Sequence, residues 1–169
     1  MVHDPDLLDR LEAVGAAPFA GEVWRHMFAG LDPARPNTRG ARWDPPGVAA
    51  IYTSLEQATV LAGAEHVIAM QPVRPRAARH VHHIAIELRA VADLTGAGLL
   101  AEMGVDPAAL ASPDHGSCQR VGGAAYWLDF DGVLVPSARA PGTNLVVFTD
   151  RQAVDARFEV LETLAVPDP

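Results

Sequence analysis

One stretch in the first half of the chain combines an arginine, two aromatic residues and the start of a helix. Arg42 and Trp43 lie in a loop rich in glycine and proline, Tyr52 ends an expected strand, and a helix follows Ser54. A guanidinium can bind phosphate through two parallel hydrogen bonds, helix-start amides attract anions, and an aromatic ring stacks on a flat ligand. This stretch therefore predicts an anion-binding corner. In the alternative interpretation, Trp43 and Tyr52 are core residues and Arg42 forms a surface ion pair.

Three histidines near the middle of the chain invite comparison with a metal site. His80 and His82 are two residues apart on an expected strand, so they face the same way, and His83 follows directly. A metal site needs a further ligand, and no HExxH motif, cysteine pair or acidic ligand motif accompanies these residues. We therefore expect no metal and interpret the three histidines as part of a half-exposed strand.

Two other groups of reactive residue types receive structural interpretations. Cys118 follows Ser117 on an expected helix, but nothing in the sequence places a base beside either side chain, so we expect a buried, inert thiol. Asp129 and Asp131 flank a helix end and a turn, where acidic side chains commonly bond to the backbone. Catalysis by this carboxylate pair is not expected.

The hydrophobic pattern predicts helices and strands that do not strictly alternate. Asp4 and Pro5 begin a helix in which apolar residues recur at helical spacing, and Ser54 with Gln57 forms a capping-box pattern at a second helix. Strands are expected at 21–28, 48–53, 80–88, 133–135, 144–149 and 157–164, and further helices at 54–70, 98–103, 107–111 and 117–128. This order predicts a single α+β domain with a mixed central sheet and flanking helices, rather than a doubly wound parallel sheet. The long loop at 30–47 is expected to be functional.

Charge and cysteine content narrow the class of function. The 169 residues include 21 acidic and 13 basic side chains, all of the latter arginine, which give a net charge of −8 and disfavour direct binding to nucleic acid. The single cysteine excludes an internal disulfide, which fits the cytoplasm. No apolar run is long enough to span a membrane, and the acidic start is unlike a signal peptide.

Four segments together resemble the RES domain, the toxin half of bacterial RES–Xre toxin–antitoxin pairs. They are WRHMF, RGARWDPPGVAAIYTS, DHGSCQRVGGAAYW and DGVLVPSARAPGTNLVVF, within residues 21–165 of a single domain expected over 1–169. The resemblance implies a fold like that of ADP-ribosyltransferase toxins. It also implies that NAD+ is consumed as a substrate, by hydrolysis or phosphorolysis of the nicotinamide–ribose bond, with no cofactor. It further implies an Xre-type antitoxin whose C-terminal part covers the NAD+ cleft, in an assembly that the sequence leaves open.

The resemblance implies which residues of this chain form the substrate site. Arg25 and Arg42 would hold the pyrophosphate, Tyr52 would stack on a ligand ring, and Trp43 would add to the substrate site. Cleavage of the glycosidic bond develops positive charge on the ribose, which a carboxylate can stabilise. We therefore expect Arg25 and Tyr52 to act in catalysis together with a carboxylate.

The identity of that carboxylate is open. The family glutamate lies eleven residues after the tyrosine, a position that Gly63 occupies here, and Glu65 lies about 200° around the helix from it. Either Glu65 enters the site as the catalytic acid, or the chain binds NAD+ or an antitoxin without turnover. The family serine aligns near Gly116, which leaves Ser117 and Ser137 as candidates for substrate binding.

Overall fold

The computed structural model describes residues 3–151 and 156–167 and contains a mixed sheet with helices on its faces. In chain order the elements are α1 (Pro5–Val14), β1 (Ala17–Phe28), β2 (Ala50–Ser54), α2 (Gln57–Ala69), β3 (Arg79–Asp93), α3 (Leu99–Glu102), the 3-10 helix η1 (Pro107–Ala109), α4 (Gly116–Trp127), β4 (Gly132–Pro136), β5 (Thr143–Phe148) and β6 (Arg157–Val166). This arrangement confirms the predicted α+β fold with a mixed central sheet. No helix in the described ranges is long and apolar enough to cross a membrane.

The strands follow the order β1-β2-β5-β4-β3-β6, and β1 also pairs with β3. Pairing therefore forms a circuit through β1, β2, β5, β4 and β3, with β6 added along β3. The contact between β3 and β4 is parallel and the other strand pairs within the described part of the chain are antiparallel. A doubly wound parallel sheet is accordingly excluded.

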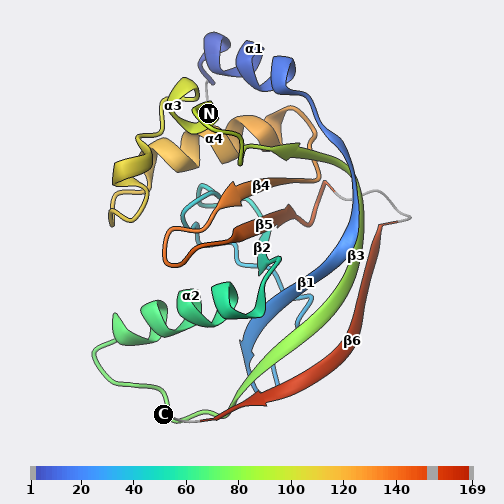
Figure 1. Ribbon diagram of the computed structural model, residues 1–169, viewed down its shortest axis with the longest axis vertical. Helices are drawn as coiled ribbons and strands as arrows, with labels where there is room; N and C mark the ends of the chain where they lie inside the picture. Colours follow the sequence, from blue (N-terminus) through green and yellow to red (C-terminus); the bar gives the residue numbers. More distant parts are fainter. Residues whose placement is uncertain (1–2, 152–155, 168–169) are drawn as a thin grey trace.

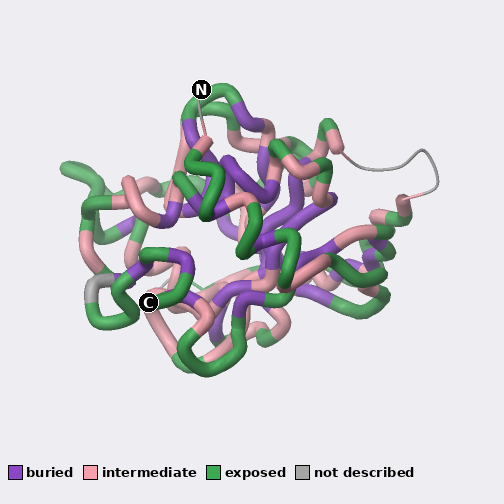
Figure 2. Tube along the Cα trace, turned by 90° about the horizontal axis from the view of Figure 1, so that it is seen from above, coloured by how far each residue is buried: buried purple, intermediate pink, exposed green. Residues whose placement is uncertain are grey.

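The long strands and the short strands form two distinct parts of the molecule. β1, β3 and β6 curve together down one side, whereas β2, β5 and β4 lie beside them, with α2 on one flank and α1, α3 and α4 gathered toward the opposite end (Figure 1). Buried residues gather in the interior of the chain trace, and exposed residues lie on its outer turns (Figure 2). One core cluster joins α1 and α4 to the short strands, and a second joins the long strands to β2 and β5.

Several expected boundaries were wrong in an informative way. β3 extends to Asp93 rather than ending at 88, because its last residues pair with β4. The predicted capping box does not form, because Ser54 is the last residue of β2 and its hydroxyl donates to Asn144 Oδ1 at 2.7 Å. Glu56 is the N-cap of α2, and its carboxylate accepts from the Thr143 amide at 3.0 Å. The same carboxylate oxygen accepts from Thr59 Oγ1 at 3.2 Å, so Glu56 ties the first turn of α2 to β5.

Candidate active site

A cavity of about 620 Å³ opens between α2 and the loop that precedes β2. Four of the predicted site residues line it, namely Arg42, Trp43, Tyr52 and Ser137, whereas Arg25, Glu65 and Ser117 do not. The lining also contains Arg139 and three histidines, and among residues 3–151 and 156–167 it includes no Asp or Glu. This cavity is therefore cationic in a chain whose net charge is −8.

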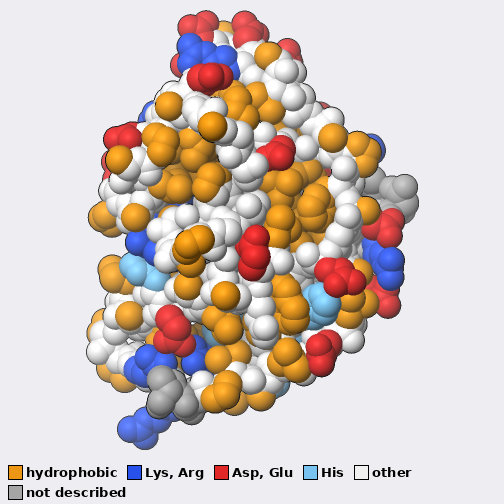
Figure 3. Space-filling view, viewed as in Figure 1, with side chains coloured by type: hydrophobic (Ala, Val, Ile, Leu, Met, Phe, Trp, Pro, Cys, Tyr) orange, Lys and Arg blue, Asp and Glu red, His pale blue; other side chains and the backbone are white. Residues whose placement is uncertain are grey.

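Apart from the buried Asp44 and Asp131, most carboxylates lie on the outer surface. On the face shown in Figure 3, acidic side chains cluster over the end of the molecule that α1 occupies, and others are scattered between apolar areas. α1 carries Asp6, Asp9 and Glu12 on its exposed turns. The positive charge of the cavity is thus a local property of its wall.

Arg42 is anchored by backbone oxygens rather than by an acid. Its Nη1 donates to the carbonyls of Leu110 and Ser112, the second at 3.0 Å. Burial lowers the pKa of Arg42, and the nearby charge of Arg139 lowers it further. A guanidinium remains protonated in proteins, so Arg42 presents a positive charge that the surrounding protein does not neutralise. The predicted role of Arg42 at an anion site fits this geometry.

Tyr52 is held by a buried polar group next to Arg42. Its hydroxyl donates to Asp44 Oδ1 at 2.6 Å and accepts from the Trp43 amide at 2.8 Å, and Asn37 donates to the other Asp44 oxygen at 3.2 Å. Burial, followed by the charge of Asp44, raises the pKa of Tyr52 well above its usual value, and burial also raises the pKa of Asp44. The hydroxyl of Tyr52 is therefore occupied, and its partly exposed ring is the part that can meet a ligand.

Trp43 is only 1% exposed and belongs to the core cluster around α4. The alternative interpretation of this residue as core thus describes its position, although it borders the cavity. Gly122 of α4 explains the close contact, because a Cβ built there would lie 1.6 Å from the Trp43 carbonyl oxygen. The helix can approach the Arg42 loop this closely only without a side chain at that position.

Arg25 lies apart from the other predicted residues. Side chains alternate along β1, and His26 and Phe28 line the cavity whereas Arg25 does not. Arg25 is buried and donates from Nη2 to the Arg35 carbonyl at 2.7 Å, and burial lowers its pKa to about 10. Its Nη1 has no hydrogen-bond partner in the described part of the chain. The predicted catalytic role of Arg25 stays a prediction that this placement does not support.

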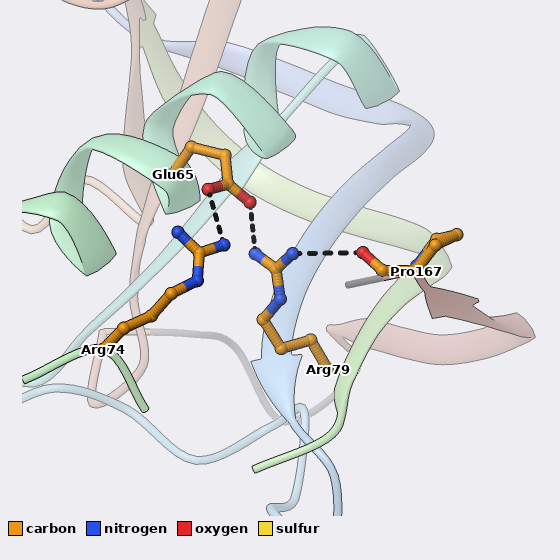
Figure 4. Close-up of polar contacts among 4 residues, drawn as sticks. All are labelled: Glu65, Arg74, Arg79 and Pro167. Atoms are coloured by element: carbon orange, nitrogen blue, oxygen red, sulfur yellow. Dashed lines mark hydrogen bonds and ion pairs between the residues drawn. The ribbon is translucent and has the colours of Figure 1, made fainter. Parts of the chain in front are cut away.

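Glu65 is engaged in ion pairs outside the cavity (Figure 4). Its carboxylate accepts from Arg79 and, at 3.2 Å, from Arg74, while Arg79 also donates to the Pro167 carbonyl at 3.4 Å. The hydrogen bond from Arg79 is the main cause that lowers the pKa of Glu65. We call these four residues the α2 latch, because they join α2 to the start of β3 and to the end of β6.

Gly63, by contrast, lines the cavity, and a Cβ built on it would meet no atom within 4 Å. The two candidate serines lie in different places relative to the cavity. Ser137 lines the cavity and accepts from the Arg139 amide at 3.3 Å, whereas Ser117, on the first turn of α4, is outside the lining.

Sequence reasoning missed Arg139, His26, His66, His115 and Asn144 as cavity residues. Alternation along the first strand offered a signal for His26, because either Arg25 or its neighbour had to face the cavity. Arg139 lies two residues after the candidate Ser137, within the segment DGVLVPSARAPGTNLVVF and shortly after the expected strand at 133–135. The positions of His115 and Asn144 depend on contacts between distant parts of the chain and had no local signal.

Two of the three strand histidines have structural partners, and the cysteine is buried. His82 bonds to Thr163 Oγ1 at 2.9 Å, and His83 stacks on Trp24 at 4.1 Å. Residues 3–151 and 156–167 contain no group of three potential ligands that could hold a metal. Cys118 is a buried free thiol whose pKa burial raises.

Asp131 is fully buried and accepts from the amides of Arg89 and Ala90 at 2.6 and 3.1 Å. These amides belong to β3, so the carboxylate joins the start of β4 to a distant strand. Asp131 accepts hydrogen bonds from the backbone as expected, but the amides are about forty residues away in the sequence rather than in its own turn.

Comparison with known proteins agrees with this fold. The RES domain family model matches residues 14–167. NAD(+) phosphorylase MbcT from Mycobacterium bovis and from Mycobacterium tuberculosis is 28% identical over 156 residues, which cover 88% of this chain and 84% of the relative. The crystal structure of the M. tuberculosis MbcT-MbcA toxin-antitoxin complex superposes with a TM-score of 0.84 at 26% identity, covering 96% of this chain and 93% of that one. The chain belongs to the RES domain family.

Proposed function

We propose that this RES protein binds NAD+ in the cavity between α2 and the Arg42 loop and cleaves its nicotinamide–ribose bond by phosphorolysis. The observation that carries the proposal is the cationic lining of the cavity, which contains Arg42 and Arg139 and, within the described part of the chain, no carboxylate. A dinucleotide with two phosphate charges suits such a lining, and the volume of about 620 Å³ lies in the usual range for ligand pockets. The relatives named NAD(+) phosphorylase support the same substrate.

The parts of NAD+ match the residues available in the cavity. Arg42 offers N–H donors to the diphosphate, and the ring of Tyr52 offers a stacking surface to a flat base. Ser137 and Asn144 add hydrogen-bonding side chains to the lining. In this arrangement Tyr52 positions the ligand by its ring, because Asp44 and the Trp43 amide occupy its hydroxyl.

Phosphorolysis fits the charge of this cavity better than hydrolysis. A phosphate oxygen forms a bond to the ribose carbon, the carbon–nitrogen bond breaks, and nicotinamide leaves with the electron pair, which gives ADP-ribose 1″-phosphate. The ribose becomes positively charged in the transition state, and an anionic phosphate supplies negative charge beside it. Water brings no such charge, and the described residues of the lining include no carboxylate that could supply it.

A second candidate function is binding of NAD+ or of an antitoxin without turnover. Gly63 occupies the position where the family resemblance places a glutamate, and Glu65 is engaged in the α2 latch. If a carboxylate is indispensable, this chain is a binding protein. The open space at Gly63 makes the question testable, because a longer side chain fits there without a clash at its Cβ.

The experiment follows NAD+ by NMR in the presence and absence of inorganic phosphate. Phosphorolysis predicts nicotinamide and ADP-ribose 1″-phosphate only when phosphate is present, and hydrolysis predicts ADP-ribose in both samples. Gly63→Glu is compared with Gly63→Gln, which matches its size without the charge. A wild-type protein that is inert, together with an active Gly63→Glu and an inactive Gly63→Gln, would replace our proposal with the binding function.

Glu65→Gln tests the remaining role of that residue. Because Glu65 lies in the latch and outside the cavity lining, we expect this variant to retain turnover. Complete loss of turnover in a variant that is still folded would return Glu65 to the role of catalytic acid.

We also propose that an antitoxin of the Xre type neutralises this protein, in the cytoplasm. The structural relative is a toxin-antitoxin complex, and the buried thiol of Cys118 suits a reducing compartment. Expression of this protein alone in a bacterial host should arrest growth, because NAD+ is consumed. Co-expression of an Xre-type antitoxin from a neighbouring gene should relieve the arrest, and the two proteins should copurify. The isolated chain should not shift duplex DNA at physiological salt, because its net charge is −8.

A further inference from the structure

A second guanidinium stands beside Arg42 in the cavity wall. Arg139 lies on the loop that joins β4 to β5, and its Nη1 donates to the Ala111 carbonyl at 3.1 Å. Arg42 donates to the carbonyls of Leu110 and Ser112, on either side of Ala111. Three consecutive backbone oxygens therefore hold two arginines that come from distant parts of the chain.

These two positive charges have no acidic partner. Neither arginine forms an ion pair with Asp or Glu in the described part of the chain, and the cavity lining contains no carboxylate. Their charges repel one another: burial is the main cause that lowers the pKa of Arg42, and the charge of Arg139 lowers it further. Burial likewise lowers the pKa of His115 in the same wall, and both arginines add to that effect. Like charges held together without compensation are disfavoured in the empty cavity and become favourable when an anion binds.

The anchoring also leaves donors for a ligand. Each guanidinium has several N–H groups in a planar fork, and the contacts with carbonyls 110–112 use one terminal nitrogen of each. The remaining N–H groups can bind two oxygens of one anion, which is the geometry by which arginine recognises phosphate. A lysine would offer a point charge without this fork.

We propose that Arg139 and Arg42 form a clamp for one phosphate group, and that Arg139 determines the preference of the cavity for phosphorylated ligands. The proposal rests on the proposed function for the identity of the substrate. The clamped group belongs either to the diphosphate of NAD+ or to the inorganic phosphate that attacks it, and both present the same tetrahedral anion. Arg139 is thus a specificity-determining residue that the family motif around Arg42 does not include.

The first test measures binding by isothermal titration calorimetry with inorganic pyrophosphate, inorganic phosphate and nicotinamide riboside, which has no phosphate. Arg139→Ala should weaken binding of the phosphate-bearing probes by about tenfold or more, because a hydrogen bond between charged groups is lost. Arg139→Lys should restore only part of the affinity, and nicotinamide riboside should be unaffected. The matched control is Arg120→Ala, which removes the same charge from an exposed position on α4 outside the lining.

Equal loss in Arg139→Ala and Arg120→Ala would overturn the clamp, because it would mean that net charge alone sets the affinity. Full affinity in Arg139→Ala would overturn it as well. Because Arg139 lies on a surface loop, we expect Arg139→Ala to keep the melting temperature of the wild type without ligand. This measurement checks that the variant is folded.

Steady-state kinetics then separate the two sources of phosphate. A raised KM for inorganic phosphate at unchanged KM for NAD+ assigns the clamp to the attacking phosphate, and the reverse assigns it to the diphosphate. Unchanged values of both would overturn the proposal. Pyrophosphate binding that depends on Arg139 in a protein that never cleaves NAD+ would support the clamp while contradicting the proposed function.

Discussion

The two walls of the cavity differ in how firmly they are built. α4, which backs the Arg42 loop, buries six of its residues, namely Cys118, Val121, Gly122, Gly123, Ala124 and Ala125. α2, which forms the other wall, buries only Thr59 and Ile68, and its last turn leaves Val67 and Met70 largely exposed. One wall is thus part of the core, and the other is a surface helix attached mainly at its ends.

The polar contacts that hold the two walls in place also differ in how buried they are. Buried hydrogen bonds among Tyr52, Asp44 and the Trp43 amide fix the Arg42 wall, and such bonds are costly to break. The start of α2 is fixed by the buried Thr59, whose hydroxyl donates to the Pro141 carbonyl at 2.9 Å. Further along the helix, the α2 wall depends on Glu65 and Arg74, both nearly half exposed, with the buried Arg79. Exposed ion pairs contribute little to stability. In our proposal, anion recognition therefore lies on the Arg42 wall, and position 63, where the family resemblance places a glutamate, lies on the less buried α2 wall.

The sharpest test of this difference substitutes one glycine in each wall. Gly122→Ala should lower the free energy of unfolding by about 3 kcal/mol, because its methyl group would overlap the Trp43 carbonyl and force α4 away from the loop. Urea unfolding of the variant and the wild type measures the change. A loss below about 0.5 kcal/mol would contradict the close packing of α4 on the loop.

A smaller effect is expected when the buried carboxylate of the Arg42 wall is removed. Asp44→Ala should cost about 2 kcal/mol of unfolding free energy, because the Tyr52 hydroxyl and the Asn37 amide lose their common acceptor. Asp9→Ala, an exposed change of the same charge on α1, serves as the control and should be nearly neutral. Equal stability of the two variants would argue against a structural role for the Asp44 contacts.

The matched substitution in the α2 wall should act in the opposite direction. Gly63→Ala should raise the free energy of unfolding by about 1 kcal/mol, since alanine favours a helix over glycine and the position has open space. The same urea titration measures it. Destabilisation by this variant would show that the α2 wall is packed more closely than the contacts around Gly63 indicate.

The smallest effect concerns pH and the α2 latch. The pKa of Glu65 is lowered in the folded protein, so its contribution to stability is present above its ordinary value of 4.5 and is lost as the pH falls through the lowered pKa. The stability difference between wild type and Glu65→Gln should therefore be greatest near neutral pH and disappear in acid. Denaturant titrations from pH 7 to pH 3 measure this difference in unfolding free energy. A difference that becomes larger at low pH would contradict the ion pairs of the latch.

Local patterns in the sequence predicted the relative placement of residues that are close in the chain. Arg42 and Tyr52 belong to one continuous motif, so their proximity followed from short-range geometry. The helical rotation of about 200° between positions 63 and 65 likewise anticipated that Gly63 and Glu65 would point to different surroundings. Residues separated by long stretches of chain were less predictable.

Arg25 and His26 illustrate why the remainder could not be predicted. Strand alternation separates these neighbours, but only the pairing of β1 with β2 and β3 decides which of them faces the cavity. Arg139 reaches the wall through carbonyls in a distant loop, and the start of α2 is set by Glu56 contacting β5 rather than by Ser54. Each of these placements depends on tertiary contacts that no local signal encodes.

The central claim, that the cationic cavity is the NAD+ site, is tested most directly by titrating NAD+ into the intact chain by calorimetry. The account predicts one-to-one binding, a raised melting temperature at millimolar NAD+, and affinity at least about tenfold weaker in Arg42→Ala but unchanged in Arg120→Ala. Absence of binding by the wild type, or identical binding by a folded Arg42→Ala variant, would contradict it.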